Sequence, residues 1–370
     1  MKQYEDLAKG ALKAYGIPIP AGQLVSSPEE GAQAVASLGS VALKAQVLVG
    51  GRGKAGGIRF AQTQQEGYEV AKAMIGMDLK GYRVDRLYAE TKLAIERELY
   101  ISVTTDRNAK KPLVMASLAG GVEIEDVADD QIVKAYVDPE VGVLPYFGRE
   151  VASALGLEGT IFKEFADLVV KLYRIYREKD AELVEINPLA VVDGHLVAAD
   201  ARLNLDDSAL YRHPDTTIVD EGSALELKVH EIGLAYVELD GDIAVMANGA
   251  GMAMATLDAI QYFGGHPANF LDAGGGASVG PTAEALDVLV SMKPKAILVN
   301  IFGGITRCDD VAAAILQVKK TSGIPVPLVV RLVGTNEQEG VALLKAAGIE
   351  AYSEMAEAAE QAVRLAKEAL

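Results

Sequence analysis

Hydrophobic and polar positions in the first two hundred residues predict a mixture of helices and strands. Apolar residues recur at helical spacing from Tyr4 to Tyr15, and Gly16 ends that predicted helix. The run Ser27-Pro28-Glu29-Glu30 has the form of a capping box with proline at the first helical position, which predicts a second helix to about residue 38. Strands are predicted at about 41–49, 58–62, 84–91, 97–105 and 112–117, helix over 150–177, and a hairpin over 181–203. This partly antiparallel order is not a simple strand–helix–strand repeat.

The pattern changes after about residue 214. Segment 213–223 is polar and contains Pro214 and Gly222, which is typical of a linker. Beyond it, short apolar strands alternate with helices, and Ser353 is expected to cap the last helix. Strands are predicted near 243–247, 268–272, 295–301, 326–332 and 349–352. Such alternation predicts an α/β fold with a doubly wound parallel sheet, so we expect two domains, 1–222 and 223–370.

Composition narrows the class of protein. A chain of 370 residues, half of them hydrophobic and 24% charged, is typical of a folded α/β enzyme with more than one domain. The net charge of −17 argues against nucleic acid or an anionic membrane as a partner. Cys308 is the single cysteine, which excludes an internal disulfide and fits a reducing compartment. The first residues lack the apolar core of a signal peptide, and no run reaches the ~18 apolar residues of a membrane span, so we expect a cytoplasmic protein.

A glycine-rich segment, 50–57, is the strongest local signal for a ligand. It reads Gly-Gly-Arg-Gly-Lys-Ala-Gly-Gly and follows a predicted strand in which Lys44 stands among apolar residues. Glycines reach positive φ without strain, so successive N–H groups can converge on an anion, and the lysine beside them is most simply a phosphate ligand. The segment is not a P-loop, because no Gly-Lys-Ser/Thr follows at the required spacing. The alternative is a flexible surface hairpin with incidental charge.

The hairpin at 185–202 places candidate metal ligands opposite one another. Asp193-Gly194 is a preferred pair for a two-residue turn, and with that turn Asn187 faces Asp200. Glu185 then faces Arg202 on the same side of the sheet. Opposed Cβ atoms are about 5 Å apart, so an amide and a carboxylate oxygen can share one cation, and such ligands suit Mg²⁺ bound with nucleotide phosphates. The alternative is a polar strand pair with an exposed salt bridge, and the proline after Asn187 can shift the register through a bulge.

Glycine-rich turns also follow predicted parallel strands, at 248–251, 272–276 and 302–306. Ligands of doubly wound sheets bind beyond the carboxyl ends of the strands, which favours a ligand here, although short glycine turns also serve packing. The last turn precedes an apolar helix whose N-terminal N–H groups, with Arg307, suit an oxyanion or phosphoryl group. That helix start can lower the pKa of Cys308, yet no base stands near it, and none of the four histidines has a metal-ligand or triad spacing.

Several motifs occur in an order that resembles one family along essentially the whole chain. They are GRGKAGG at 51–57, GGVEIE at 120–125, EINPL at 185–189, NGAG at 248–251 and VNIFGGITRCD at 299–309. Together they resemble the β-subunit family of succinate–CoA ligases. The resemblance implies an ATP-grasp domain with mixed α+β sheets, followed by a flavodoxin-like CoA-ligase domain. It also implies ATP or ADP and Mg²⁺ as ligands, a dicarboxylate substrate, and an αβ or α2β2 complex whose α subunit binds CoA and carries the phosphorylated histidine.

The resemblance further implies site residues, position by position. Nucleotide contacts are implied for Lys44, Gly51, Arg52, Gly53, Glu90, Leu93 and Glu98. Mg²⁺ ligands are implied for Asn187 and Asp200, in agreement with the hairpin geometry. Glu185 matches a carboxylate that orients the partner's histidine, and the acyl-substrate and phosphohistidine region matches Asn248, Gly304, Ile305 and Thr306. Catalysis would then be mainly positioning and charge neutralisation by Lys44, Arg52 and the metal.

Alternatives remain open on the sequence. A malate– or citrate–CoA ligase β subunit would keep the mechanism with another acid, and Thr306 stands where members of the family vary. A dinucleotide-binding oxidoreductase is suggested by Gly249-Ala250-Gly251 with Asp272 downstream, but Met254 stands where that fingerprint needs glycine or alanine. A non-catalytic regulatory subunit is a further alternative, and the intact set of predicted phosphate and metal ligands counts against it.

Overall fold

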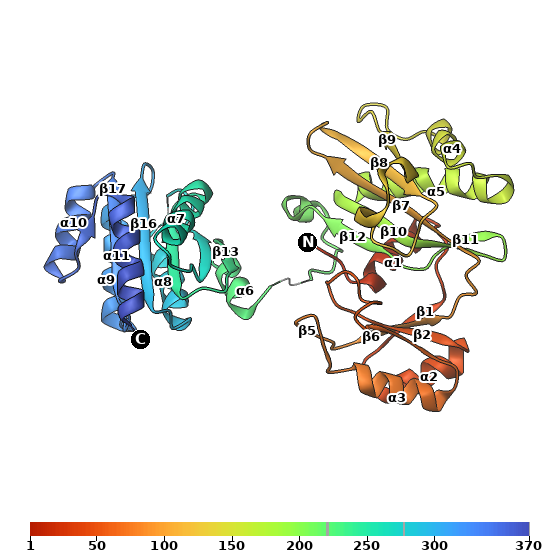
Figure 1. Ribbon diagram of the computed structural model, residues 1–370, viewed down its shortest axis with the longest axis horizontal. Helices are drawn as coiled ribbons and strands as arrows, with labels where there is room; N and C mark the ends of the chain where they lie inside the picture. The colour runs from red at the N-terminus through yellow and green to blue at the C-terminus, as the bar shows by residue number, and fades with distance from the viewer. Residues whose placement is uncertain (220–221, 277, 370) are drawn as a thin grey trace. The chain divides into compact units, whose positions relative to one another are not determined.

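The contacts within the chain divide it into two compact units, Met1–Glu221 and Gly222–Leu370. The computed structural model describes residues 1–219, 222–276 and 278–369, and Figure 1 shows the elements of both units. The predicted linker includes residues 220 and 221, which lie outside the described residues. Each unit has hydrophobic cores of its own, so each is described by itself. In the described ranges, no helix combines the length and apolar character that crossing a membrane requires.

The first unit contains a 4-stranded antiparallel sheet of order β1-β6-β2-β3. Its strands are β1 (Gly22–Val25), β2 (Val41–Ala45), β3 (Ile58–Ala61) and β6 (Leu87–Thr91). Helices α2 (Pro28–Leu38) and α3 (Gln64–Met74) cover one face, where Ala34, Ala71 and Met74 are fully buried. The sequence analysis missed α3, although Thr63 and Glu66 form a complete capping box at its start.

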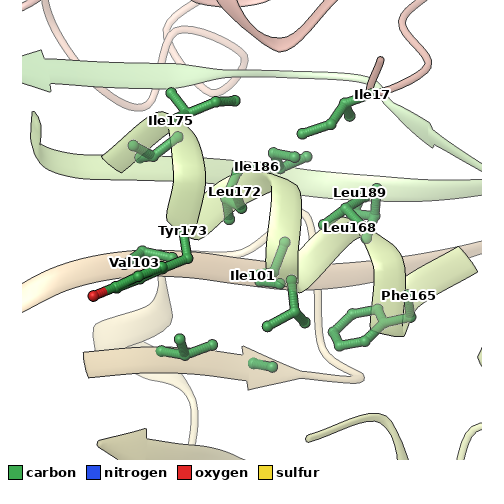
Figure 2. Close-up of a cluster of buried hydrophobic side chains, with 14 of the residues drawn as sticks. Ile17, Ile101, Val103, Phe165, Leu168, Leu172, Tyr173, Ile175, Ile186 and Leu189 are labelled. Atoms are coloured by element: carbon green, nitrogen blue, oxygen red, sulfur yellow. The ribbon is translucent and has the colours of Figure 1, made fainter. Parts of the chain in front are cut away.

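A 6-stranded sheet forms the rest of this unit, in the order β11-β10-β7-β8-β9 with β12 pairing β10. Its strands are β7 (Arg97–Asp106), β8 (Lys111–Ser117), β9 (Ile132–Tyr136), β10 (Ala181–Val192), β11 (His195–Ala198) and β12 (Arg202–Leu205). Figure 2 shows the core between this sheet and α5 (Gly159–Glu178), where Leu168 and Leu172 pack near Ile101 and Ile186. The single helix predicted over 150–177 is two helices, since α4 (Pro145–Ala154) ends before Gly156, whose φ is 66°.

Shorter elements complete the first unit. Helix α1 (Glu5–Ala14) contributes Ala8 and Leu12 to the core under the 6-stranded sheet. The remaining elements are β4 (Asp78–Leu79), β5 (Tyr82–Arg83) and the 3₁₀ turns η1 (Ile124–Asp126), η2 (Asp129–Gln131) and η3 (Asp207–Arg212).

The second unit is built on a 6-stranded sheet of order β13-β15-β14-β16-β17-β18. Its strands are β13 (Ala235–Glu238), β14 (Ile243–Ala247), β15 (Asn269–Asp272), β16 (Ala296–Gly303), β17 (Leu328–Gly334) and β18 (Ala351–Tyr352). All pair in parallel except β13, an antiparallel edge strand that the sequence analysis missed. The parallel strands follow the flavodoxin-like order, so the predicted doubly wound sheet is confirmed.

Helices cover both faces of this sheet. On one face, α7 (Ala250–Tyr262) and α11 (Met355–Glu368) pack on the core that includes Ile260 and Val363. On the other face lie α6 (Ala224–Glu231), α8 (Val279–Ser291), α9 (Cys308–Thr321) and α10 (Glu337–Ala346).

Element ends differ from the predictions in small ways. The strand predicted over 41–49 ends at Ala45, before the glycine-rich segment 50–57. The last helix starts after Glu354, so the prediction that Ser353 caps it is wrong. At α2 the Ser27 hydroxyl accepts the Glu30 N–H as expected, but the Glu30 carboxylate accepts the N–H of Ser26, so the capping box closes one residue early.

Candidate functional site

One pocket of the first unit is lined by most of the predicted phosphate, metal and catalytic residues, although Lys44 is not among the described residues that line it. Its lining includes Gly51, Arg52 and Gly53 from the loop after β2, Glu185 and Asn187 from β10, and Asp200 beyond β11. It is also lined by loop 121–123 and by residues next to α1. A loop of the 4-stranded sheet therefore faces strands of the 6-stranded sheet across this pocket.

The hairpin that carries the predicted metal ligands has the predicted register. Asp193 and Gly194 have positive φ of 49° and 75°, as a type I′ turn requires. Glu185 pairs with Arg202, which confirms that the two strands are aligned as the turn dictates.

Asp200 lies where two short strands leave a gap. Strand β11 ends at Ala198 and β12 begins at Arg202, while β10 runs past both without interruption and carries Asn187. The bulge considered for this strand lies on its other edge, where the pairing with β7 shifts between Ile186 and Leu189. Asp200 therefore lies between two strands, outside the regular strand pairing, and its side chain lines the pocket.

Asn187 holds the loop that closes one side of the pocket. Its Oδ1 accepts the N–H of Gly121 at 2.8 Å, and its Nδ2 donates to the carbonyl of Val122 at 2.9 Å. Gly121 has a φ of 71°, and a Cβ there would collide with the Glu98 carboxylate, so the loop requires glycine. An amide oxygen has a second lone pair, which leaves Asn187 able to bind a cation.

Charged side chains form a buried group beside the pocket, which we call the ion cluster: Glu5, Lys9, Lys44, Arg52, Glu90 and Asp200. Lys44 Nζ lies 2.9 Å from Glu5 Oε1 and 2.6 Å from Glu90 Oε1. Arg52 Nη2 lies 2.7 Å from Glu5 Oε2 and donates to the Asp200 carboxylate at 2.9 and 3.2 Å. Lys9 pairs with both Glu5 and Glu90. The cations and carboxylates of the cluster balance one another in charge.

Glu5 and Lys9 are the site residues that the sequence analysis missed. The buried stripe of α1 consists of Glu5, Ala8, Lys9 and Leu12, which is the spacing of a helix face turned to a core. Charges inside such a stripe need partners, because an unpaired buried charge is very costly. A Glu–Lys pair at i, i+4 within an apolar stripe is the signal that could have found them.

The cluster shifts the pKa of Glu5, Lys44, Arg52 and Asp200. Burial alone raises the pKa of Glu5, but Lys44, Lys9 and Arg52 outweigh it and hold that pKa well below its usual range. Burial lowers the pKa of Lys44 and Arg52, yet the carboxylates around them, Glu5 first, raise both above their usual values. Burial and the nearby Glu5 raise the pKa of Asp200 despite Arg52. The negative charge of Asp200 is thus only partly compensated by its neighbours, and a further cation would stabilise the ionised carboxylate.

Glu185 is a half-buried acid that lines the same pocket. Burial raises its pKa, and Arg202 across the hairpin opposes the shift only in part. The Tyr100 hydroxyl donates to Glu185 Oε2 at 3.3 Å. A carboxyl group with a raised pKa that lines a pocket is suited to hold or exchange a proton with a bound group.

Among the described residues that line this pocket, none is a residue predicted to contact the base and ribose. Glu90 is 3% exposed, and its two oxygens are engaged by Lys9 and Lys44. Leu93 and Glu98 do not line the pocket within the described part of the chain, although Glu98 lies beside Gly121 at its edge.

In the second unit, the glycine-rich turns meet at the carboxyl ends of β14, β15 and β16. Asn248 Oδ1 accepts the N–H of Phe302 at 2.8 Å, and its Nδ2 donates to the Phe302 carbonyl at 2.9 Å. The buried Thr306 hydroxyl accepts the N–H of Gly276 at 3.0 Å, and Ile305 beside it is 83% exposed. The structure therefore brings the predicted acyl-site residues, Asn248 and Gly304 to Thr306, to one edge of this sheet.

Asp272 has a structural use in the same place. Its Oδ1 accepts the N–H groups of Gly249 at 2.5 Å and Gly274 at 2.7 Å. This is the carboxylate that a dinucleotide-binding protein would need for a ribose. Here it ties two glycine-rich turns together.

The start of α9 differs from the expectation. Arg307 donates to both oxygens of Asp309, at 3.2 and 2.8 Å, so its guanidinium is already held by a carboxylate. Cys308 is fully buried, and burial, with Glu337 and Asp309 nearby, raises its pKa, so the lowered pKa considered from the sequence is wrong.

Comparisons with known proteins agree with this architecture. The family model of the ATP-grasp domain matches residues 2–191, and that of the CoA-ligase domain matches residues 246–368. The chain is 46% identical over 374 residues to the β subunit of succinate–CoA ligase [ADP-forming] from Ignicoccus hospitalis, covering 99% of each chain. It is 45% identical over 379 residues to the same subunit from Herpetosiphon aurantiacus, covering 100% of each.

Among solved structures, an ATP citrate lyase from Methanothrix soehngenii in complex with citrate and coenzyme A shares the fold. Its TM-score is 0.79 at 20% identity, over 98% of this chain and 99% of that one. The two β-subunit relatives are 45–46% identical to this chain over nearly their whole length, and both family models match it, so the chain belongs to the family of β subunits of ADP-forming succinate–CoA ligases.

Proposed function

We propose that this chain acts with an α-subunit partner to convert ATP, succinate and CoA into ADP, phosphate and succinyl-CoA. The observation that carries the proposal is the pocket of the first unit, where the glycine-rich loop, Glu185, Asn187 and Asp200 line one space. Backbone N–H groups of a glycine-rich loop, a guanidinium and oxygen ligands for a cation are what a nucleotide polyphosphate requires.

The donor set fits Mg²⁺. Asp200 supplies a carboxylate whose ionised form a cation would stabilise, and Asn187 supplies an amide oxygen with a second lone pair. In the described ranges no three or more His, Cys, Asp or Glu residues are grouped to hold a metal by themselves. Mg²⁺ commonly binds through one or two protein oxygens together with substrate phosphates, so this pair is sufficient. When bound, the metal would neutralise phosphate charge; Lys44 and Arg52 would do the same from the protein.

Phosphoryl transfer would then proceed by positioning. The γ-phosphoryl group leaves ADP as its P–O bond breaks, and a P–N bond forms to a histidine of the α partner. Glu185, a pocket-lining acid with a raised pKa, would orient that imidazole and hold its N–H proton. In this division of roles the histidines of this chain need not be catalytic: His195 and His213 hydrogen-bond with Glu164 and Asp180, and neither is among the described residues that line the pocket.

The acid substrate would be activated at the edge of the second unit's sheet, where β14, β15 and β16 end. There the phosphoryl group passes from the histidine to a carboxylate oxygen of succinate, and the CoA thiol displaces phosphate from the acyl phosphate. Asn248, Gly304, Ile305 and Thr306 are proposed to contact the acid, and the N-terminal N–H groups of α9 would stabilise the developing negative charge.

ADP release by the complex of this chain with its α partner tests the proposal. ATP, Mg²⁺ and CoA are supplied with succinate, malate or citrate in turn. Turnover that requires succinate and CoA supports the proposal, and turnover with only malate or citrate replaces the substrate while keeping the mechanism. A formed complex that releases no ADP with any acid would favour the regulatory subunit instead. The mass of the same complex distinguishes αβ from α2β2.

A further inference from the structure

Glu5 is the centre of the ion cluster. It lies on α1, is 3% exposed, and contacts every cation of the cluster. Its Oε1 is 3.0 Å from Lys9 Nζ and 2.9 Å from Lys44 Nζ, and its Oε2 is 2.7 Å from Arg52 Nη2. One carboxylate therefore bridges Lys44 and Arg52, the two cations proposed above to bind the nucleotide phosphates, of which Arg52 lines the pocket.

Lys9 extends this arrangement to the proposed metal ligand. It is fully buried, and its Nζ donates to the carbonyl of Ala199 at 2.8 Å. Lys44 donates to the same carbonyl at 2.5 Å. Ala199 directly precedes Asp200, so the two lysines hold the backbone from which the Asp200 side chain projects.

The cluster joins elements that are distant in sequence. Lys44 and Glu90 lie on β2 and β6 of the 4-stranded sheet, Glu5 and Lys9 lie on α1, and Asp200 follows β11 of the 6-stranded sheet. Stability alone does not account for so many buried charges, because well-packed apolar residues in place of a buried ion pair are often as stable or more so. A requirement for exact placement of Lys44, Arg52 and Asp200 does account for them.

We propose that Glu5 is a positioning residue for the nucleotide phosphates: it fixes Lys44 and Arg52 in the arrangement that a nucleoside diphosphate or triphosphate requires. The inference rests on the proposed function, since it assumes that a nucleotide occupies the pocket. Glu5 acts through the two cations and not on the nucleotide itself. Its loss should therefore weaken binding of the phosphate groups and leave binding of the base and ribose unchanged.

The test compares Glu5→Gln with the wild-type chain, each reconstituted with the α partner. Calorimetry gives the Kd of ADP with Mg²⁺ and the Kd of adenosine, which has no phosphate. We expect ADP to bind at least tenfold more weakly to the variant, as for the loss of a hydrogen bond to a charged group, and adenosine to bind within threefold of wild type. Glu5→Asp keeps the charge but withdraws the carboxylate by one methylene; it should change the ADP Kd in the same direction and serves if Glu5→Gln does not fold.

Asp6→Asn is the matched control on the same helix. Asp6 faces Arg86 at 3.7 Å instead of the ion cluster, so its neutralisation should leave the ADP-to-adenosine ratio unchanged. An equal loss for both ligands in the Glu5 variants would overturn the inference and indicate a purely structural role. Unchanged or tighter ADP binding would also overturn it. Failure of the wild-type complex to bind ADP at all would instead reject the proposed function.

Discussion

Replacing Asp200 by asparagine should raise the Mg²⁺ concentration that nucleotide binding requires. The amide keeps the shape of the side chain and removes its charge. In the wild-type chain, the cations Lys9, Lys44 and Arg52 face the carboxylates Glu5, Glu90 and Asp200, so the cluster is neutral. In the variant the cluster carries a positive charge at the point where a divalent cation has to bind.

The size of the effect follows from charge and exposure. Two unit charges 4 Å apart at an effective dielectric constant of 20 interact by about 4 kcal/mol. The Asp200 side chain keeps 29% of its surface exposed, so solvent screens part of this attraction. Halving the interaction for screening leaves about 2 kcal/mol, which corresponds to a roughly 30-fold change in the Mg²⁺ requirement.

The assay is a Mg²⁺ titration at fixed ADP, read by calorimetry at about 0.1 M ionic strength, where distant charges are screened. The half-saturating Mg²⁺ concentration of Asp200→Asn should exceed that of wild type by about 30-fold, by the estimate above. Asp193→Asn is the control, because Asp193 lies exposed at the hairpin tip with a φ of 49°, which asparagine tolerates. A titration of Asp200→Asn that coincides with the control would refute both the metal assignment and the charge argument.

Two further predictions concern the first unit. Leu172→Ala removes a fully buried side chain from the core in Figure 2 and should lower the free energy of unfolding by about 2–5 kcal/mol; a urea-denaturation loss below about 1 kcal/mol would contradict the packing described here. Glu185→Gln should change the pH dependence of stability. Burial raises the pKa of Glu185 in the folded chain, so its contribution is fully present below the unfolded pKa of about 4.3 and is lost as pH rises through the folded pKa. The stability of Glu185→Gln relative to wild type should therefore increase with pH across that window, and a constant difference would show that the pKa is not raised.

The sequence predicts those parts of the molecule that depend on local chemistry. The Asp193-Gly194 turn determines the hairpin register, and therefore the pairing of Glu185 with Arg202, without any knowledge of the rest of the chain. The apolar strands of the second unit alternate with helices, so their order along the chain implies a parallel sheet. The edge strand β13 was missed because it is 4 residues long and buries one side chain, that of Tyr236.

The ion cluster could not be predicted in the same way. The sequence predicts that Lys44 binds a phosphate, and in the structure it pairs with Glu5 and Glu90. These partners come from α1 and β6, and only the tertiary fold brings them together. The contact of Asn187 with Gly121 likewise joins positions 66 residues apart. Local patterns identify the residue types that a site needs, whereas the partners that hold them depend on long-range packing.

The separate cores of the two units bear on how such a chain can evolve. The six residues of the ion cluster belong to the first unit, and the turns around Asn248 and Thr306 belong to the second. Mutations in the turns of the second unit, which are proposed above to contact the acid, can thus accumulate without changing the residues of the ion cluster. The citrate lyase chain that keeps this fold at 20% identity indicates how much sequence drift the two-core design tolerates. On the proposed division of roles, a lineage could change its acid substrate by altering a few turn residues of the second unit while it inherits the nucleotide pocket of the first unit unchanged.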